Sequence, residues 1–340
     1  MQGRAALRVL LLAVVLAAVG ALLYGWYDFN RFSRAPLHVT TQGDSIDIAR
    51  GTSFRNIVGE LRQRGLTSAD PLYWWLLAEQ MRVAGKLHAG EYALEAGITP
   101  RQLLTNMATD KVLQRNLTIV DGWTFAQLRE ALAKAEKLEH DTATLDDAAI
   151  MKKIGATGEA PEGRFLPETY AYVKGDSDLD VLKRAHLAMA KTLDAMWPAR
   201  DKDLPLATPY DALILASIVE KETGRADERA RIAGVFVRRL QDHMLLQTDP
   251  SVIYGMGAAY NGSIHKVDLA TDTPYNTYTR PGLPPTPIAL PGKPALQAAL
   301  HPAPGNELYF VARGDGGHVF ASTLEEHNRN VDCYQRKHCQ

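Results

Sequence analysis

The chain has 340 residues, of which 46% are hydrophobic and 23% charged, and this composition is typical of a folded protein rather than a disordered or collagen-like one. Its net charge of −1 argues against a generally basic nucleic-acid-binding protein. Two cysteines, Cys333 and Cys339, are too few for a disulfide framework or a thiolate zinc site, and the length indicates about two domains.

An uncharged apolar run covers residues 9–27, which is close to the ~20 residues that a helix needs to cross a bilayer. Tyr24, Trp26 and Tyr27 stand at its far end, as interfacial aromatic residues do. A cleaved signal peptide is the alternative, but the run continues beyond the small residues that would fit a cleavage site. We therefore expect a single uncleaved transmembrane helix over 9–27, a cytoplasmic segment over 1–8 and the remaining chain outside the cytoplasm.

Residues 38–112 are predicted to form a small α+β module, joined to the anchor by a polar connection over residues 30–36. Its helices should begin where a capping residue or a proline marks a first turn, and residues 90–94 should form a strand. The three helix starts are Thr52-Ser53, Ser68-Ala69-Asp70-Pro71 and Thr99-Pro100. The aromatic run Tyr73-Trp74-Trp75 favours a place in the core, with a sugar-stacking surface as the alternative.

A larger α+β domain is expected over residues 113–335. Its pattern predicts a strand over 117–120, a helix from Thr124, a polar helix over 139–149 and an amphipathic helix over 179–196. Further along, Gly314-Asp315-Gly316-Gly317 separates two short apolar runs, which is typical of a hairpin turn and not of a nucleotide-binding loop.

One helix of this domain places a carboxylate in apolar surroundings. Thr208-Pro209 starts it, and residues 212–219 are apolar except for Ser217, so the helix should be buried on all sides. Glu220 follows this run and shares a face with small residues, whereas Glu222 shares its face with bulky ones. Burial and the negative end of the helix dipole would both raise the pKa of Glu220 and suit it to general acid catalysis. The structural alternative is an ion pair with Arg225, Arg229 or Arg238.

Amide, hydroxyl and aromatic side chains follow this helix, a mixture that suits sugars. They lie in the segments Leu246-Gln247-Thr248-Asp249-Pro250-Ser251-Val252-Ile253-Tyr254-Gly255, Tyr275-Asn276-Thr277-Tyr278 and Gly282-Leu283-Pro284-Pro285. The histidines lack the short helical spacing of a zinc hydrolase, and Ser217 lacks a nucleophile-elbow context. We therefore expect no metal site, no cofactor and no serine nucleophile.

Together with Ala216-Ser217-Ile218-Val219-Glu220-Lys221-Glu222, these segments resemble the endolytic murein transglycosylase family, also called YceG-like. The segment from Glu162 to Tyr170 resembles the family too, although its Phe165-Leu166 order and Glu168 depart from the usual pattern. The resemblance covers nearly the whole chain and includes a small module similar to LysM peptidoglycan-binding units.

The resemblance implies cleavage of peptidoglycan between N-acetylmuramic acid and N-acetylglucosamine without water, leaving 1,6-anhydro ends and limiting the length of nascent strands. It implies Glu220 as the catalytic residue and a single-pass protein of the inner membrane with its catalytic domain in the periplasm. Peptidoglycan synthases and elongation proteins are implied partners. The expected substrate-binding residues are Glu162, Gln247, Thr248, Asp249, Tyr254, Tyr275, Asn276 and Tyr278.

Two other functions stay open at the level of the sequence. One is a noncatalytic peptidoglycan-binding scaffold, which would tolerate the loss of Glu220. The other is a hydrolase with two carboxylates, in which Glu162, Glu168 or Asp249 would be the partner of Glu220.

Overall fold

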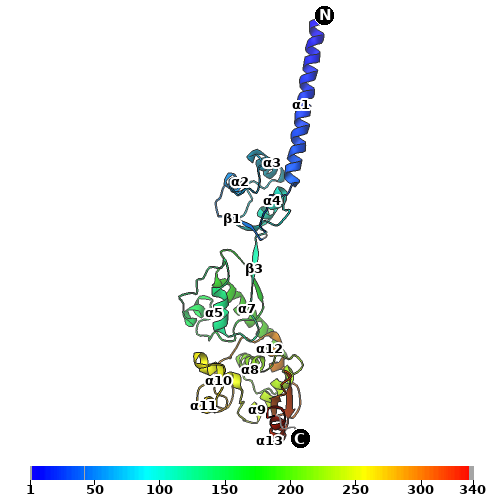
Figure 1. The fold of residues 1–340 in the computed structure, drawn as a ribbon. Helices are drawn as coiled ribbons and strands as arrows, with labels where there is room; N and C mark the ends of the chain where they lie inside the picture. The colour runs from blue at the N-terminus through cyan, green and yellow to red at the C-terminus, as the bar shows by residue number, and fades with distance from the viewer. Residues whose placement is uncertain (1, 42, 337–340) are drawn as a thin grey trace. The chain divides into compact units, whose positions relative to one another are not determined.

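The computed structural model describes residues 2–41 and 43–336, so Met1 of the predicted cytoplasmic segment and Cys339 lie outside the described residues. The chain divides into two compact units, which we call unit 1 (Met1–Arg115) and unit 2 (Asn116–Gln340). Helices predominate, and three two-stranded sheets are distributed among them in the described residues (Figure 1), which confirms the predicted α+β class. The predicted boundaries at residues 38, 112, 113 and 335 remain predictions, as does the LysM-like nature of the small module.

Unit 1 begins with the long helix α1 (Gln2–Arg34). Its segment Leu7–Arg34 is long and apolar enough to cross a membrane by length and composition. The prediction of a polar connection over residues 30–36 is wrong for residues 30–34, because α1 continues to Arg34. Phe29 and Phe32 pack against aromatic rings of the same unit and so favour continuation of the helix.

The rest of unit 1 is an antiparallel pair of strands with three short helices. Side chains of Ser53, Asp70 and Thr99 cap the three helices, each within the predicted start segment. The elements are β1 (Ser45–Ile48), α2 (Phe54–Gln63), α3 (Pro71–Met81), β2 (Gly90–Ala93) and α4 (Pro100–Ala108).

The aromatic run at the start of α3 divides between core and surface. Trp74 is fully buried, and Tyr73 is half-buried. Trp75 is 50% exposed, so its expected place in the core is wrong. Consecutive residues of a helix point about 100° apart, so three neighbours cannot all face one core.

Unit 2 contains two further strand pairs and the remaining helices. β3 pairs with β4, and β5 with β6 forms the predicted antiparallel hairpin. The strands are β3 (Gln114–Thr118), β4 (Thr169–Val173), β5 (Tyr309–Ala312) and β6 (His318–Ala321). The helices are α5 (Phe125–Ala133), α6 (Asp147–Lys153), α7 (Asp178–Met196), α8 (Pro209–Glu222), α9 (Arg229–Gln241), α10 (Asp249–Met256), α11 (Lys266–Ala270), α12 (Lys293–Leu300) and α13 (Leu324–Tyr334).

The polar helix predicted over residues 139–149 is mostly wrong, since helix begins only at Asp147. The backbone N–H and the hydroxyl of Thr142 both donate to the buried carboxylate of Asp178, and Glu139 forms a bridge with Ser177. These bonds outside the segment compete with the local hydrogen bonds that a helix would need.

The core of unit 2 surrounds α8, which packs against α7, α9, α10 and α12. Residues 212–219 of α8 are all buried, as the apolar pattern predicts. This packing fixes the end of the helix at which Glu220 lies.

Candidate active site

The sequence of α8 explains why the helix starts and ends where it does. Thr208 accepts a hydrogen bond from the backbone of Asp211, and the Asp211 carboxylate accepts one from the backbone of Thr208, which forms a capping box. Pro209 occupies the first turn, where its missing N–H costs nothing. Glu220 lies in the last turn, two residues before the end.

The carboxylate of Glu220 is held in a nearly buried position. Its side chain is 7% exposed, and Oε2 accepts a hydrogen bond of 3.0 Å from the backbone N–H of Gly292. The guanidinium of Arg229 lies 3.8 Å from Oε1. Among the three arginines considered from the sequence, Arg229 is therefore the ion-pair partner of Glu220, whereas Arg225 pairs with Asp227 and Arg238 with Glu307.

Burial raises the pKa of Glu220 above its usual range. The Gly292 hydrogen bond and the charges of Arg229 and Lys221 oppose this shift, while the nearby carboxylate of Asp121 adds to it. A carboxyl group in this environment can hold a proton and can also be stabilised after losing it, which are the two states that a single acid–base residue requires.

Gly292 reaches Glu220 beside the side chain of Asp121. A Cβ at position 292 would lie 2.4 Å from Oδ1 of Asp121, so a larger residue there would require the Asp121 carboxylate to move. The turn carrying Asp121 is tied to the same segment, since Gly122 donates to the carbonyl of Leu290 at 2.9 Å. Lys221 donates to the carbonyl of Gly122 at 3.2 Å. The end of α8, this turn and the segment before α12 thus meet around one carboxylate.

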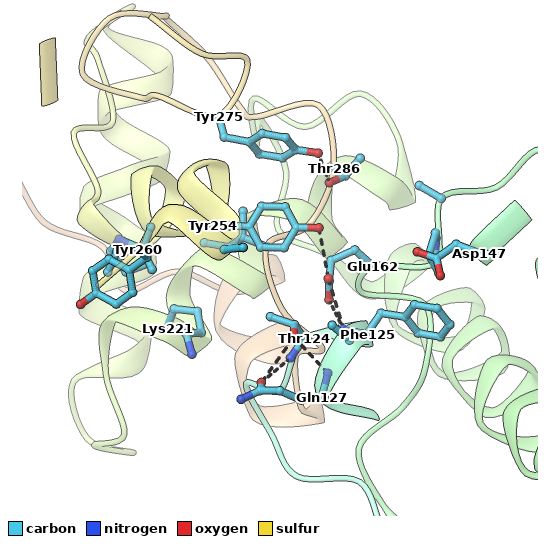
Figure 2. Close-up of a pocket in the computed structure, with 18 of the residues that line it drawn as sticks. Thr124, Phe125, Gln127, Asp147, Glu162, Lys221, Tyr254, Tyr260, Tyr275 and Thr286 are labelled. Carbon is cyan, nitrogen blue, oxygen red and sulfur yellow. Dashed lines mark hydrogen bonds between the residues drawn. The ribbon is translucent and has the colours of Figure 1, made fainter. Parts of the chain in front are cut away.

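A cavity of about 1160 Å³ lies beside this end of α8, with Lys221 in its wall (Figure 2). Its lining joins α5, the loop before Glu162, α10 and the segment around Thr286. Glu220 itself is outside this lining. Three of the predicted substrate-binding residues, Glu162, Tyr254 and Tyr275, belong to it.

Glu162 is buried at the wall of this cavity and accepts hydrogen bonds from three residues. The backbone N–H of Phe125 donates to Oε1 at 3.0 Å, and the hydroxyl of Tyr254 donates to Oε2 at 3.1 Å (Figure 2). The backbone of Gly163 supplies a further bond. Burial nevertheless raises the pKa of Glu162 to about 7, and the hydrogen bonds only limit this shift.

The aromatic side of the cavity consists of Tyr254 and Tyr275, whose rings pack edge to face with centroids 4.9 Å apart. The Tyr275 hydroxyl lies 2.9 Å from Oγ1 of Thr286 (Figure 2). Aromatic faces beside hydroxyl and carboxyl groups are what a sugar ring needs, because its apolar face can stack while its hydroxyls form hydrogen bonds.

Other predicted residues gather around a second cavity of about 380 Å³, on which Glu222 lies. Gln247, Asp249 and Tyr278 line it, and the Tyr278 hydroxyl donates to Asp249. The buried Thr248 donates its hydroxyl hydrogen to Glu222. Burial raises the pKa of Glu222 to about 7.

Asn276 is buried, and its side-chain amide donates to three backbone carbonyls between residues 268 and 271. Its Oδ1 accepts from the backbone of Tyr278. These bonds join Asn276 to the end of α11 and to the segment that follows it, so Asn276 fixes the conformation of residues 268–278.

The sequence predicts one groove lined by all of these residues, whereas the structure divides most of them between two cavities, one lined by Lys221 and the other by Glu222 at the end of α8. Asp121 and Gly292 near Glu220, and Arg129, Asp147 and Tyr260 on the larger cavity, were not predicted. They lie far from Glu220 in sequence and carry no motif that would single them out. In the part of the chain that the structure describes, there is no group of three or more His, Cys, Asp or Glu side chains that could hold a metal ion.

Comparison with known proteins gives one consistent result. The profile of the YceG-like family matches residues 46–333. The endolytic murein transglycosylase of Bacillus subtilis (strain 168) is 30% identical over 311 residues, covering 85% of this chain and 84% of that protein. A protein of the same name from Streptococcus pneumoniae serotype 2 is 27% identical over 354 residues, covering 94% of this chain and 63% of that protein.

A crystal structure of a YceG-like protein from Listeria monocytogenes has a similar fold, with a TM-score of 0.52 and 27% sequence identity. The similarity covers 85% of this chain and 99% of that one.

Proposed function

The chain belongs to the YceG-like family, and from this premise we propose that it is an endolytic murein transglycosylase, a lyase that cuts peptidoglycan glycan strands at internal bonds. The observation that carries the chemistry is the nearly buried carboxyl of Glu220, with a backbone N–H on one oxygen and an arginine facing the other. No cofactor or metal is required by this reaction.

Glu220 serves as acid and then as base in this proposal. The protonated carboxyl gives its proton to the glycosidic oxygen as the bond from C1 of N-acetylmuramic acid breaks. The C6 hydroxyl of the same sugar then attacks C1, and the Glu220 carboxylate takes the hydroxyl proton. No water is consumed, Glu220 regains its proton, and the strand ends in a 1,6-anhydro ring. Gly292 and Arg229 stabilise the intervening carboxylate.

The larger cavity is the proposed binding site for the glycan, with Tyr254 and Tyr275 stacking on sugar rings and Glu162 accepting a hydroxyl hydrogen bond. Gln247, Asp249 and Tyr278 are proposed to contact the glycan from the smaller cavity. Thr248 and Asn276 have buried side chains whose polar atoms are bonded within the protein, so we assign them to positioning these loops.

We further propose that α1 is an uncleaved anchor in the inner membrane and that unit 2 acts in the periplasm. The apolar length of α1 supports an anchor, because it is sufficient to cross a bilayer. An enzyme tethered in this way would reach mainly strands that are still close to the bilayer. Unit 1 would then add peptidoglycan binding, as a LysM-like module would. Glycan-polymerising synthases and elongation proteins are the proposed partners.

Mass spectrometry of glycan strands incubated with the full chain in H₂¹⁸O tests this function. We expect internal fragments that end in 1,6-anhydro sugar and carry no ¹⁸O. Labelled reducing ends would identify a hydrolase, and intact strands bound by folded protein would identify a scaffold.

The hydrolase is the second candidate, because unit 2 holds two further buried carboxyls, Glu162 and Glu222, whose pKa values burial raises to about 7. A retaining or inverting hydrolase requires a second carboxylate on the scissile bond. Glu168, by contrast, is exposed and paired with Lys293, which makes it a poor second residue.

A further inference from the structure

The last turns of α1 are part of the packed core of unit 1. The ring of Phe29 packs on Tyr73 with centroids 6.2 Å apart, and Phe32 packs on Trp74 at 5.4 Å. Tyr73 and Trp74 belong to the first turns of α3. In Figure 1, α3 lies next to the last turns of α1, on the side of unit 1 from which the apolar part of that helix emerges. The beginning of α3 is therefore fixed relative to α1.

A polar contact places this end of α3 level with the end of the apolar stretch. The hydroxyl of Tyr73 donates to Oδ2 of Asp28 at 2.8 Å, and Asp28 directly follows the uncharged run. Asp28 through this bond, and the nearby Tyr24 to a smaller extent, raise the pKa of the Tyr73 hydroxyl. Tyr24 and Asp28 are one turn apart, about 6 Å along the helix axis. Tyr73 thus lies within about one helical turn of the expected membrane boundary.

The outer face of α3 carries three large apolar side chains. Leu72 is 56% exposed, Trp75 50% and Leu76 39%. Their spacing of three and four residues puts them on one side of the helix. Among the described residues of unit 1 beyond α1, no other large hydrophobic side chain is exposed to this degree. The three residues form what we call the α3 apolar face.

We propose that the α3 apolar face docks on the bilayer surface beside the anchor, so that Leu72, Trp75 and Leu76 lie at the lipid interface. This inference rests on the proposed role of α1 as a membrane anchor. Tryptophan is favoured at the level of lipid headgroups, and leucines beside it gain free energy by leaving water. Arg31 of α1 is exposed about one turn beyond Asp28, where a cation can meet lipid phosphate.

Docking would give the anchor a second function. A helix attached through a mobile linker would leave the small unit free in solution, but contact on both α1 and α3 would hold unit 1 against the membrane. A single transmembrane helix and a short apolar face then act together, as two linked binding sites do.

Quenching of tryptophan fluorescence by brominated lipids tests this contact in the full chain. The protein is reconstituted in phosphatidylcholine–phosphatidylglycerol vesicles without glycan. Trp26→Phe removes the tryptophan of the anchor, and Trp26→Phe/Trp75→Phe also removes the one on the α3 apolar face. We expect quenching to fall about twofold or more in the double variant, because Trp75 is at the interface, Trp74 is buried, and Trp123 and Trp197 are the same in both proteins. Equal quenching in the two proteins would overturn the proposal.

Two leucines of equal exposure provide a matched control. In the Trp26→Phe protein, Leu72→Ser should weaken the quenching of Trp75, whereas Leu187→Ser should not, since Leu187 is also 56% exposed but lies on α7 in unit 2. A Trp75 emission that is blue-shifted but unquenched would assign the face to a protein contact and overturn membrane docking.

Extraction of the same vesicles with alkaline carbonate separates this inference from the anchor on which it rests. A chain that is released has no anchor, and both proposals fail. A chain that is retained but whose Trp75 is not quenched has an anchor without docking. Glycan cleavage by the same vesicles reports the enzymatic function independently of either result.

Discussion

At the residue scale, Arg229 is one of the groups that oppose the effect of burial on the pKa of Glu220, after the Gly292 hydrogen bond. Its guanidinium lies 3.8 Å from the carboxylate, and its own Nε is buried without a hydrogen-bond partner in the structure. Arg229 therefore acts through its charge on Glu220, which makes it a positioning residue in the proposed reaction.

Arg229→Gln should shift the pH dependence of cleavage. Arg229 lowers the pKa of Glu220, so removing its charge raises that pKa. In a plot of kcat/KM against pH, the alkaline limb reports loss of the Glu220 proton in the free enzyme, so this limb should move to higher pH. We also expect kcat to fall, because the Glu220 carboxylate that acts as the base is less stabilised without Arg229. Arg231→Gln is the control, since the exposed Arg231 pairs with Glu307. A limb that stays in place or moves to lower pH would contradict this role.

Glu162 should make the stability of the protein depend on pH. Its pKa rises from an ordinary 4.5 to about 7 in the folded state, so its stabilising contribution is complete below pH 4.5 and is lost as pH rises through 7. At 1.36 kcal/mol per pKa unit, the free energy of unfolding should fall by about 3 kcal/mol from this group.

Urea unfolding of Glu162→Gln at several pH values measures this effect. We expect the variant to lose less stability than the wild type between pH 4.5 and 7. Glu325→Gln, on the exposed face of α13, should follow the wild type. Parallel curves for all three proteins would show that the Glu162 carboxyl does not carry the effect.

The sequence singles out Glu220 because an acid directly after eight apolar or small residues is conspicuous. It does not single out Gly292, whose N–H donates to Glu220 from 72 positions away, or Asp121, which packs against that glycine. Such contacts depend on the tertiary fold, and neither residue type is unusual in its own segment. The predicted role of Glu220 itself stays a prediction until a variant is assayed.

At the scale of the element, Ser217 connects α8 to the segment that carries Gly292. Its hydroxyl donates to the carbonyl of Ile214 at 2.7 Å and accepts from the buried N–H of Ile288 at 3.0 Å. Ile288 lies four residues before Gly292 in the same chain segment. One serine inside the helix thus fixes the distance between α8 and the backbone that binds Glu220.

Ser217→Ala should destabilise unit 2 and also lower the rate of cleavage. The Ile288 N–H would remain buried without an acceptor, at a cost of about 1–3 kcal/mol in the free energy of unfolding. Urea unfolding and kcat are the measurements, and Ser263→Ala at an exposed loop position is the control. A loss of stability with unchanged kcat would limit Ser217 to a structural role.

Helix starts are predicted well because capping depends on residues close in sequence. Ser53, Asp70, Thr99 and Thr208 all cap helices in the structure. The segment 139–149 fails for the opposite reason, since its hydrogen-bond partner Asp178 lies 36 residues away from Thr142. Local propensity cannot reveal such a competitor.

At the scale of the whole molecule, the length of α1 suits the uncleaved anchor that we propose in place of a cleaved signal peptide. The helix extends beyond the apolar run to Arg34, and its last turns pack inside unit 1. Cleavage by a signal peptidase within residues 9–27 would leave the last turns of α1 packed in unit 1 but would remove the apolar part of the helix that crosses the membrane.

We expect the full chain to be uncleaved and to stay with membranes after carbonate extraction. Its intact mass should include the apolar run of residues 9–27. As a control, a chain whose α1 is interrupted by Leu16→Arg should be released, because a charged side chain at the centre of the span costs about 2.5–3.5 kcal/mol. Release of the wild type, or a mass lacking this run, would indicate a cleaved signal.

Three carboxyls of unit 2 have a raised pKa, those of Glu162, Glu220 and Glu222, and we propose that Glu220 is the one that transfers the proton. The most direct measurement compares strand cleavage by Glu162→Gln, Glu220→Gln and Glu222→Gln, with circular dichroism to confirm folding. We expect Glu220→Gln to lose roughly 10²–10⁴-fold in cleavage rate, with measurable anhydro products from the other two variants. Cleavage that survives Glu220→Gln, or an equal loss in one of the other variants, would contradict it.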